Sequence, residues 1–322
     1  MRILLIKTSS LGDVIHNLPI VSDLRRAFPG AAIDWCVEES FTDIPRLHPD
    51  VADIIPVAVR RWRKTLFQSS TWREIGAFRK RIKLRYYDAV LDTQGLIKSA
   101  LIARIARGHR YGYAREAARE PFAARFYDEI FVIPSTMHAV ERNRWLASAA
   151  FGYAIGSLPD YGINAPGRDF DWMTDTPFCL LFTASSRNAK LWDEANWVSL
   201  AQALFDREKL TPVLPSGTPE ERARAERIAR QLPEAIVAPP LQLHELASLI
   251  KKARIAIGVD TGLIHLATAL RTPSLALYLA SDPALTGIYG AGFHRNLGAP
   301  GQAPAVAEVL TVAGQALFES RP

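Results

Sequence analysis

A carboxylate stands in a short turn where phosphate-binding loops of α/β proteins usually carry glycines. Residues 7–19 read KTSSLGDVIHNLP and follow the apolar run Ile3–Ile6, so a strand, a turn and a helix are expected in that order. Asp13 would repel an anionic ligand, and the turn holds a single glycine. Two roles for Asp13 remain open. It caps the helix, or it stays ionised at the helix N-terminus and accepts a proton from a substrate hydroxyl.

A second loop carries groups that suit a phosphate. Residues 183–192 read TASSRNAKLW and follow an apolar run. The adjacent hydroxyls of Ser185 and Ser186, the backbone N–H groups of the turn and the ammonium of Lys190 are donors that suit an anionic phosphate. A polar surface loop that binds nothing is the alternative.

A third loop, residues 258–265 (GVDTGLIH), also joins a strand to a helix. Its Asp-Thr-Gly turn places N–H donors at the helix start. The alternatives to a binding role are that Asp260 only caps the helix and that His265 is a satisfied helix histidine. The chain has no G-x-G-x-x-G segment, no P-loop and no Cys/His/Asp cluster at metal-ligand spacing. We therefore expect no metal and no cofactor.

Strands that alternate with helices position these loops. The alternation predicts an α/β fold with two Rossmann-like domains, each a doubly wound parallel sheet, facing each other across a central cleft. Segment 158–177 is rich in Pro, Gly and Asp, so domains are expected over 1–160 and 161–322. The expected strands are 2–6, 33–37, 87–92, 130–133, 178–183, 212–214, 235–238, 254–259 and 274–279. The expected helices are 14–28, with a kink or restart at Pro19, 96–107, 138–151, 194–207, 219–232, 244–253 and 263–270.

The charge of the chain is unevenly distributed. The net charge is +6, but residues 1–160 carry +7 and the remainder −1. Between Arg60 and Arg125 there are 17 basic and 5 acidic residues, which points to an anionic partner for the first half. A merely solvated basic face is one alternative. A nucleic-acid-binding protein is another, but stacking aromatics and a recognition module are lacking, so no nucleic acid is expected.

The cellular compartment is indicated by cysteines and hydropathy. Cys36 and Cys179 both lie in apolar runs and are expected to be buried and reduced. No segment has the length of a membrane span or the pattern of a signal peptide. These features predict a cytoplasmic protein.

Six segments resemble those of the bacterial lipopolysaccharide heptosyltransferases, and their order and spacing are most similar to the heptosyltransferase I group. The similarity extends from residue 1 to about residue 300. The segments are Lys7–His16, Arg60–Lys64, Asp92–Ser99, Arg119–Pro121, His138–Arg142 and Asp260–Leu266.

The resemblance implies a GT-B fold, with a C-terminal helix over about 304–320 that packs back on the first domain. It also implies that L-glycero-D-manno-heptose moves from ADP-heptose to the first Kdo of Kdo-lipid A, with inversion at the anomeric carbon. The runner-up is a heptosyltransferase II, which acts on the heptosylated acceptor. A sensor that binds ADP-heptose without turnover is a third class.

Site residues follow from the same resemblance. Asp13 would be the base, and Lys190 would neutralise charge on the departing ADP, the role a metal has in other transferases. The residues implied for donor binding are Ser185, Ser186, Lys190, Asp260, Thr261, Gly262 and His265, with Glu220 or Glu221 on the ribose. The residues implied for acceptor binding are Ser10, Gly12, Arg60, Arg61, Arg63, Lys64, Gln94 and Arg119.

The sequence differs from the family pattern in two segments. Ser185-Ser186 stands where the family has paired threonines, and Leu279–Pro283 replaces a Gly-Pro-Thr-Asp-Pro-like segment. Lipid A phosphates and Kdo carboxylates are anionic, and Trp62, within the basic stretch 60–64, is a residue suited to a membrane interface. Peripheral attachment to the cytoplasmic face of the inner membrane is therefore predicted. The protein is expected to be a monomer.

Overall fold

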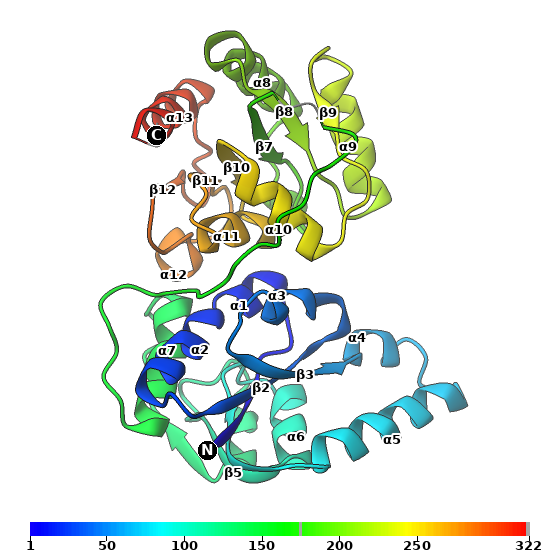
Figure 1. Ribbon diagram of the computed structural model, residues 1–322, viewed down its shortest axis with the longest axis vertical. Coiled ribbons are helices and arrows are strands. Elements are labelled where there is room, and N and C mark those ends of the chain that lie inside the picture. Colours follow the sequence, from blue (N-terminus) through cyan, green and yellow to red (C-terminus); the bar gives the residue numbers. More distant parts are fainter. Residues whose placement is uncertain (174–175, 320–322) are drawn as a thin grey trace. The chain divides into compact units, whose positions relative to one another are not determined.

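The computed structural model describes residues 1–173 and 176–319. The chain forms two compact units, Met1–Ile163 and Asn164–Pro322. This division lies inside the segment where the sequence places the domain boundary. Figure 1 shows that each unit consists of a sheet with helices packed around it.

The first unit contains a parallel sheet of six strands, in the spatial order β3-β2-β1-β4-β5-β6. Its central strand β1 consists of apolar residues that are fully buried from Ile3 to Ile6, as expected for a strand covered on both faces. The strands are β1 (Arg2–Ile6), β2 (Ala32–Glu38), β3 (Val51–Val57), β4 (Tyr86–Asp92), β5 (Arg107–Tyr113) and β6 (Glu129–Phe131).

The first unit contains three helices that the sequence reading did not predict, Asp43–Arg46, Val59–Trp62 and Ser69–Lys83, and one predicted helix ends earlier than expected. The helix expected over 14–28, with a kink or restart at Pro19, is two helices, which confirms the restart. Pro19 lies in the first turn of the second helix, where its missing N–H costs nothing. The helix expected over 96–107 ends at Ile105, because β5 begins at Arg107. The helices are α1 (Leu11–Ile15), α2 (Leu18–Ala27), α3 (Asp43–Arg46), α4 (Val59–Trp62), α5 (Ser69–Lys83), α6 (Ile97–Ile105) and α7 (Ala139–Phe151), with 3₁₀ turns η1 (Glu39–Phe41) and η2 (Pro121–Phe126).

The second unit repeats the topology of the first. Its strands have the order β12-β11-β10-β7-β8-β9, which is the same order as in the first unit when the strands are counted from one. The predicted class, two doubly wound Rossmann-like units, is confirmed. The strands are β7 (Phe178–Phe182), β8 (Thr211–Leu214), β9 (Ile236–Val237), β10 (Ile255–Val259), β11 (Ser274–Leu277) and β12 (His294–Leu297). The helices are α8 (Glu194–Glu208), α9 (Pro219–Ala229), α10 (Leu243–Lys252), α11 (Gly262–Ala269), α12 (Pro283–Thr286) and α13 (Val306–Glu319), with the 3₁₀ turn η3 (Asn188–Lys190).

The last helix, α13, packs on its own unit. Val309, Ala313 and Leu317 belong to the hydrophobic core that α13 shares with α8 and with strands β10 and β11. Its expected contact with the first unit stays a prediction. No helix within the described residues is long and apolar enough to cross a bilayer. Cys36 and Cys179 are buried and free, as predicted.

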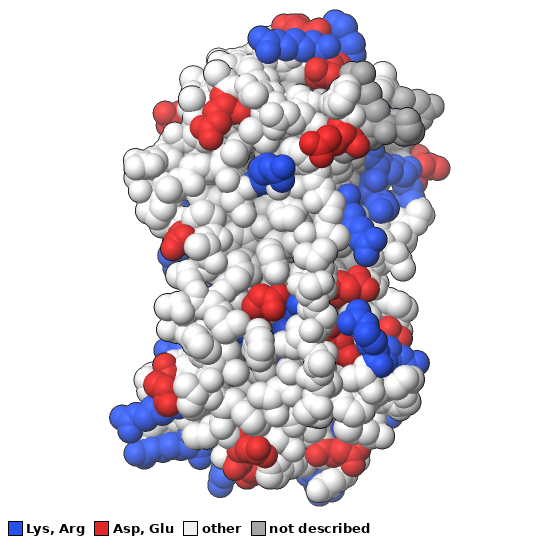
Figure 2. Space-filling view, turned by 90° about the vertical axis from the view of Figure 1, so that its left-hand side faces the viewer, with Lys and Arg blue, Asp and Glu red and all other residues white. Residues whose placement is uncertain are grey.

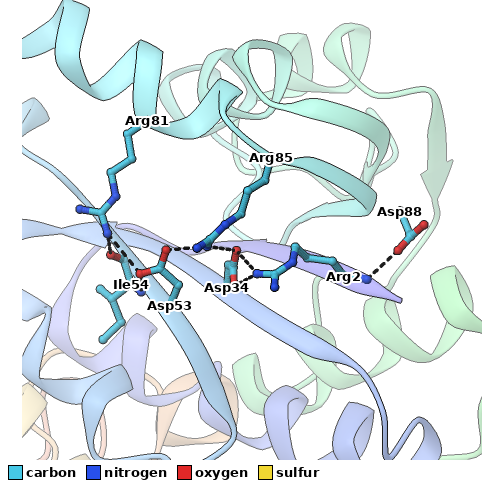
Figure 3. Close-up of polar contacts among 7 residues, drawn as sticks. All are labelled: Arg2, Asp34, Asp53, Ile54, Arg81, Arg85 and Asp88. Atoms are coloured by element: carbon cyan, nitrogen blue, oxygen red, sulfur yellow. Dashed lines mark hydrogen bonds and ion pairs between the residues drawn. The ribbon is translucent and has the colours of Figure 1, made fainter.

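An ion-pair network fastens α5 to the first sheet (Figure 3). The buried carboxylate of Asp34 in β2 accepts hydrogen bonds from Arg2 at 2.9 Å and from Arg85 at 2.9 Å. Arg85 also reaches Asp53 in β3 at 2.6 Å, and Arg81 donates to Asp53 at 3.2 Å. The C-terminal end of α5 is therefore tied to two strands at once.

Candidate active site

The loops singled out by the sequence lie where ligands bind in such folds. In each sheet the chain leaves the two central strands in opposite directions, and this switch point opens a crevice at the carboxyl ends of the strands. In the first unit the switch point lies between β1 and β4, which pair with Ile6 opposite Asp92. In the second unit it lies between β7 and β10, which pair with Phe182 opposite Gly258. The turn that carries Asp13 follows β1, and the other two loops follow β7 and β10.

Asp13 has one carboxylate oxygen occupied and one open. Oδ2 accepts hydrogen bonds from the backbone N–H of Ser10 at 2.8 Å and from its hydroxyl at 2.9 Å, and Arg119 Nη1 lies 3.7 Å away. No residue of the described chain donates to Oδ1, and the side chain is 26% exposed. Asp13 therefore caps α1 and can also accept a proton, so the two roles suggested by the sequence are compatible.

The charges around Asp13 keep it ionised. Burial disfavours the carboxylate, but the Lys7 ammonium, the Arg119 guanidinium and the two hydrogen bonds from Ser10 outweigh it and lower the pKa of Asp13. An Asp with a lowered pKa is a weak base at neutral pH. It is suited to a reaction in which the attacking oxygen becomes acidic before it gives up its proton.

Lys7 is a site residue to which the sequence reading gave no role. Its ammonium is buried and donates to the carbonyl of Thr93 at 2.7 Å and to Oδ1 of Asn143 at 3.3 Å. Burial lowers the pKa of Lys7 to about 8, against the opposing charge of Asp13. The signal was present in the sequence, because a lysine directly after a buried strand must be held by polar groups or lie at a site.

Gln94 and Lys98 hold the turn between β1 and α1. The side-chain carbonyl of Gln94 accepts from the backbone N–H of Thr8 at 2.7 Å and from its hydroxyl at 2.8 Å, while its amide donates to the carbonyl of Ser9 at 3.1 Å. Lys98 donates to the hydroxyl of Ser9 at 2.9 Å. Gln94 is thus chiefly a positioning residue in this structure, and its contact with the acceptor stays a prediction.

The segment that carries Arg119 is tied to the loop after β4. Glu120 donates its backbone N–H to the carbonyl of Gly95 at 3.0 Å and accepts a hydrogen bond from the N–H of Ile97 at 2.6 Å. Arg119 remains 57% exposed at its side chain. With the exposed Ser10 and the half-exposed Gly12, it lies at the rim of the Asp13 site.

The four basic residues of segment 60–64 are not equivalent. Arg60 stacks on the ring of Phe41, with 5.1 Å from its guanidinium carbon to the ring centre. Arg61 is neutralised by two carboxylates, Glu39 at 2.9 Å and Glu74 at 2.8 Å. Arg63 and Lys64 are exposed and, among the described residues, form no ion pair. The charge available to an anion comes chiefly from Arg60, Arg63 and Lys64.

Trp62 does not lie at a membrane interface, and this prediction is wrong. The residue is 9% exposed and belongs to the core of the first unit. Its indole packs edge-on against Phe78, with 5.8 Å between ring centres, and its N–H donates to Glu74 at 2.8 Å. Burial of the apolar body with a partnered N–H is the usual placement of a core tryptophan.

Asp260 gathers the polar residues of the second site. Lys190 Nζ lies 2.5 Å from Oδ2, Ser281 donates to the same oxygen, and His265 Nε2 lies 3.6 Å from Oδ1. Burial disfavours the charge of Asp260, but the donors His265, Lys190 and Ser281 outweigh it and hold the pKa of Asp260 well below its usual range. Asp260 is more than a helix cap, and His265 is part of the cluster.

The hydroxyls and backbone donors expected for a phosphate surround this cluster. Ser185 donates to the backbone carbonyl of Asp260 at 3.1 Å, which links the loop after β7 to the loop after β10. Ser186 is exposed in the same loop. Thr261 is the N-cap of α11 and Gly262 its first residue, so N–H groups of the first turn are available to an anion. The unusual segment 279–283 contributes Ser281, which is hydrogen-bonded to Asp260.

Glu220 and Glu221 differ in what they already bind. Glu221 folds back to accept the N–H of Gly217 at 2.8 Å, and its own N–H donates to Thr218 at 3.2 Å, so it closes the turn before α9. Glu220 is exposed, and its pKa is lowered by hydrogen bonding to its own backbone N–H and to Thr218. Of the two carboxylates, that of Glu220 is the more exposed, and binding of a ribose by either residue stays a prediction.

Arg224 is a second residue that sequence reasoning missed. From α9 it donates to the carbonyl of Thr183 at 3.1 Å, to Glu194 at 3.0 Å and to the carbonyl of Trp192. It therefore holds both ends of the loop that carries Ser185, Ser186 and Lys190. An arginine three residues after Glu221 on an otherwise charged helix gives no sequence signal of this role.

Metal ligands do not cluster in the described part of the chain. No group of three or more His, Cys, Asp or Glu side chains there could hold a metal ion. The charge at the second site that could stabilise an anion is supplied by Lys190 together with helix N–H groups.

Comparison with known proteins defines the class. The fold, two Rossmann-ordered sheets each with a polar switch-point site, is that of a GT-B glycosyltransferase. The E. coli heptosyltransferase WaaC with ADP superposes with a TM-score of 0.87 at 38% identity, covering 99% of each chain. The same enzyme with ADP-2-deoxy-2-fluoro heptose gives 0.85 at 37% identity and covers 100% of each chain.

Sequence relatives define the family. The model of glycosyltransferase family 9 (heptosyltransferase) matches residues 75–309. Lipopolysaccharide heptosyltransferase 1 of Salmonella typhimurium is 42% identical over 292 residues, which cover 90% of this chain and 92% of that protein. The chain belongs to glycosyltransferase family 9, the heptosyltransferases, and is a glycosyltransferase.

Proposed function

We propose that the enzyme transfers L-glycero-D-manno-heptose from ADP-heptose to the first Kdo of Kdo-lipid A, with inversion, in the synthesis of the lipopolysaccharide inner core. The observation that carries this proposal is the Asp13 carboxylate, whose Oδ2 is fixed by Ser10 while its Oδ1 is open. ADP and ADP-2-deoxy-2-fluoro heptose in WaaC support the donor, and the name of the Salmonella relative supports a lipopolysaccharide acceptor.

The reaction is a single displacement. The acceptor hydroxyl oxygen forms a bond to the anomeric carbon while the bond from that carbon to the ADP oxygen breaks. The hydroxyl proton moves to Oδ1 of Asp13, and the electron pair of the broken bond leaves on ADP. The lowered pKa of Asp13 fits a late proton transfer, when the attacking oxygen already carries positive charge.

The donor is assigned to the second unit and the acceptor to the first. Ser185, Ser186 and Lys190 would bind the diphosphate, with N–H groups from Thr261 and Gly262, while Glu220 would bind the ribose. Lys190 is held by Asp260 at 2.5 Å and so is pre-positioned to meet the charge that develops on the departing ADP. Asp260, with His265 beside it, would bind sugar hydroxyls through the lone pairs that its partners leave.

The proposed place of work is the cytoplasmic face of the inner membrane of a Gram-negative cell. Its acceptor is a lipid with phosphates and carboxylates, and the first unit carries the positive charge of the chain. On the face drawn in Figure 2, basic and acidic side chains are intermixed. The unpaired cations Arg63 and Lys64 lie in the loop before α5, where an anionic acceptor is proposed to bind.

The decisive test is incubation of the enzyme with ADP-heptose and Kdo-lipid A, followed by mass analysis of the lipid. The expected product is heavier by one heptose, with the opposite anomeric configuration to the donor, and forms equally in the presence of a chelator. Parallel reactions contain lipid that already bears one heptose. Transfer only to that lipid would replace the proposal with a heptosyltransferase II, and donor binding without any product would indicate a sensor.

A further inference from the structure

The tip formed by residues 63–73 exposes apolar side chains. Leu66 is 45% exposed, Trp72 is 61% exposed and Phe67 is fully exposed. In Figure 1, α5 projects from the body of the first unit, and the loop that enters it from α4 lies at its outer end. Large apolar side chains grouped at a protruding tip lose free energy in water and indicate a surface that meets an apolar partner.

This tip is ordered by its own hydrogen bonds. The Thr71 hydroxyl donates to the carbonyl of Thr65 at 2.8 Å, and the two threonine hydroxyls lie 2.8 Å apart. The indole N–H of Trp72 donates to the carbonyl of Leu66 at 2.8 Å, which closes the loop from the other side. The backbone is thus satisfied locally, and the apolar side chains are held outward by a formed turn.

The base of the tip is firmly attached to the first unit. Phe78 and Ile82 are buried on the inner face of α5. The ion-pair network of Figure 3 then ties Arg81 and Arg85 to the sheet. The tip is therefore carried by a helix whose C-terminal end is fixed to the first unit.

Cationic residues flank the apolar residues along the chain. Arg63, Lys64 and Arg73 are exposed, and none of them forms an ion pair within the described chain. Arg61, one turn away, is by contrast neutralised by Glu39 and Glu74. Exposed apolar residues with cations next to them in the same segment match the layering of an anionic membrane surface, with phosphates outside and acyl chains below.

We propose that the tip inserts Leu66, Phe67 and Trp72 into the interfacial layer of an anionic bilayer, while Arg63, Lys64 and Arg73 bind its phosphates. The anchor shares Arg63 and Lys64 with the acceptor contact of the proposed function, but vesicle binding needs neither ADP-heptose nor Kdo and so can fail or succeed independently of transfer. It assigns to Phe67 and Trp72 the interfacial role that the sequence suggested for Trp62. The bilayer is favoured over a second copy of the chain because the cations have no acidic partner surface on the tip itself.

The test compares the triple variant L66S/F67S/W72S with W145S, which removes another exposed tryptophan (49% exposed, against 61% for Trp72) from α7. Sedimentation is measured with vesicles of phosphatidylglycerol and phosphatidylethanolamine, without either substrate. The triple variant should partition at least about tenfold less, because burying each aromatic side chain alone is worth about that factor. W145S should bind like the wild type.

Thermal unfolding and the salt and lipid dependence of vesicle binding complete the test. The Tm of both variants should match that of the wild type, since the replaced side chains are exposed. A large decrease in Tm of the triple variant alone would show that the tip side chains stabilise the fold, and would overturn the anchor. Binding should fall with salt and be weak on phosphatidylcholine vesicles. Equal vesicle binding by wild type and triple variant would refute the proposal, as would a concentration-dependent dimer that only the triple variant loses.

Discussion

The two switch points of this enzyme use a carboxylate in opposite ways. In the first unit Asp13 is held through one oxygen, keeps the other open and has a cation no closer than 3.7 Å. In the second unit Asp260 is almost fully buried and engaged by Lys190, Ser281 and His265. The same sheet topology therefore supports a carboxylate with an oxygen open to a proton and a carboxylate whose oxygens already accept from several donors, which suits it to holding other groups in place. The number of donors around each oxygen decides the role.

The largest expected effect is the loss of turnover in Asp13→Asn. The amide keeps the size and part of the capping ability but cannot accept the proton, so kcat should fall by about a hundredfold or more. ADP affinity and Tm should barely change. Asp43→Asn, which removes a first-turn carboxylate from α3 in the same unit, is the matched control. If both variants kept comparable turnover, Asp13 would be only a helix cap.

A smaller effect is expected from Lys190→Ala, measured as ADP affinity by calorimetry. A charged hydrogen bond is worth about 1.5–3 kcal/mol, so the Kd should rise by about tenfold to a hundredfold. Lys190→Arg should rescue poorly, because a planar guanidinium does not occupy the place of an ammonium beside Asp260. Lys252→Ala breaks an exposed ion pair with Asp169 in the same unit and should leave ADP binding intact. An unchanged Kd in Lys190→Ala would remove this residue from the donor site.

A several-fold effect is expected for the pair Arg63→Gln and Lys64→Gln. These cations have no carboxylate partner within the described chain, so their loss should raise the KM for Kdo-lipid A by about three- to tenfold and reduce its salt dependence. The KM for ADP-heptose should stay constant. Arg61→Gln should instead lower Tm with little change in the acceptor KM, because Arg61 is already neutralised by Glu39 and Glu74. The reverse pattern would show that the paired arginine contacts the acceptor.

The smallest effect is a shift in pH dependence in Lys7→Met. The Lys7 charge lowers the pKa of Asp13, so its removal should raise that pKa and move the acid limb of kcat/KM to higher pH. The pH dependence of the free energy of unfolding should also change, through the titration of Lys7 itself. With a folded pKa of about 8 and an unfolded pKa of about 10.4, Lys7 is protonated only in the unfolded chain between these values.

The stability of the wild type should therefore rise as pH increases from about 8 to about 10, and that rise should be missing in Lys7→Met. Denaturant unfolding at a series of pH values measures both curves. Identical acid limbs for the two proteins would show that Lys7 does not act on Asp13.

The fold was predictable because most central strands are continuous apolar runs. Strands β1 and β7 show this directly. Sequence reading missed three strands, all at or next to a sheet edge. β5 reads RGHRYGY and β12 reads HRNL, and both lack an apolar run. β3 reads VADIIPV, in which Asp53 and Pro56 interrupt the apolar residues. Pro19 was correctly taken as a helix restart, since its ring excludes it from a helix interior.

The sequence predicted which residue types form the site, but not which ion pairs and hydrogen bonds those residues make. Arg61 and Arg63 are the same residue type in one basic run, yet only Arg61 forms ion pairs with carboxylates among the described residues. Its partners Glu39 and Glu74 lie in η1 and α5 and are brought to it by folding. The same holds for Arg224, whose role depends on backbone carbonyls brought to it by folding. Local sequence carries no record of such tertiary partners.

The network around Asp34 has a consequence for how this protein would behave under genetic selection. Arg2 begins β1, Asp34 is the third residue of β2 and Arg85 directly precedes β4, whereas Asp13 follows the carboxyl end of β1. A substitution of Asp34 leaves two arginines without their buried counter-charge and should reduce the abundance of enzyme in the cell. Molecules that still fold would turn over normally. Mutants selected for a truncated cell-surface glycolipid should thus fall into two groups, one with scarce enzyme of normal specific activity and one with normal amounts of inactive enzyme.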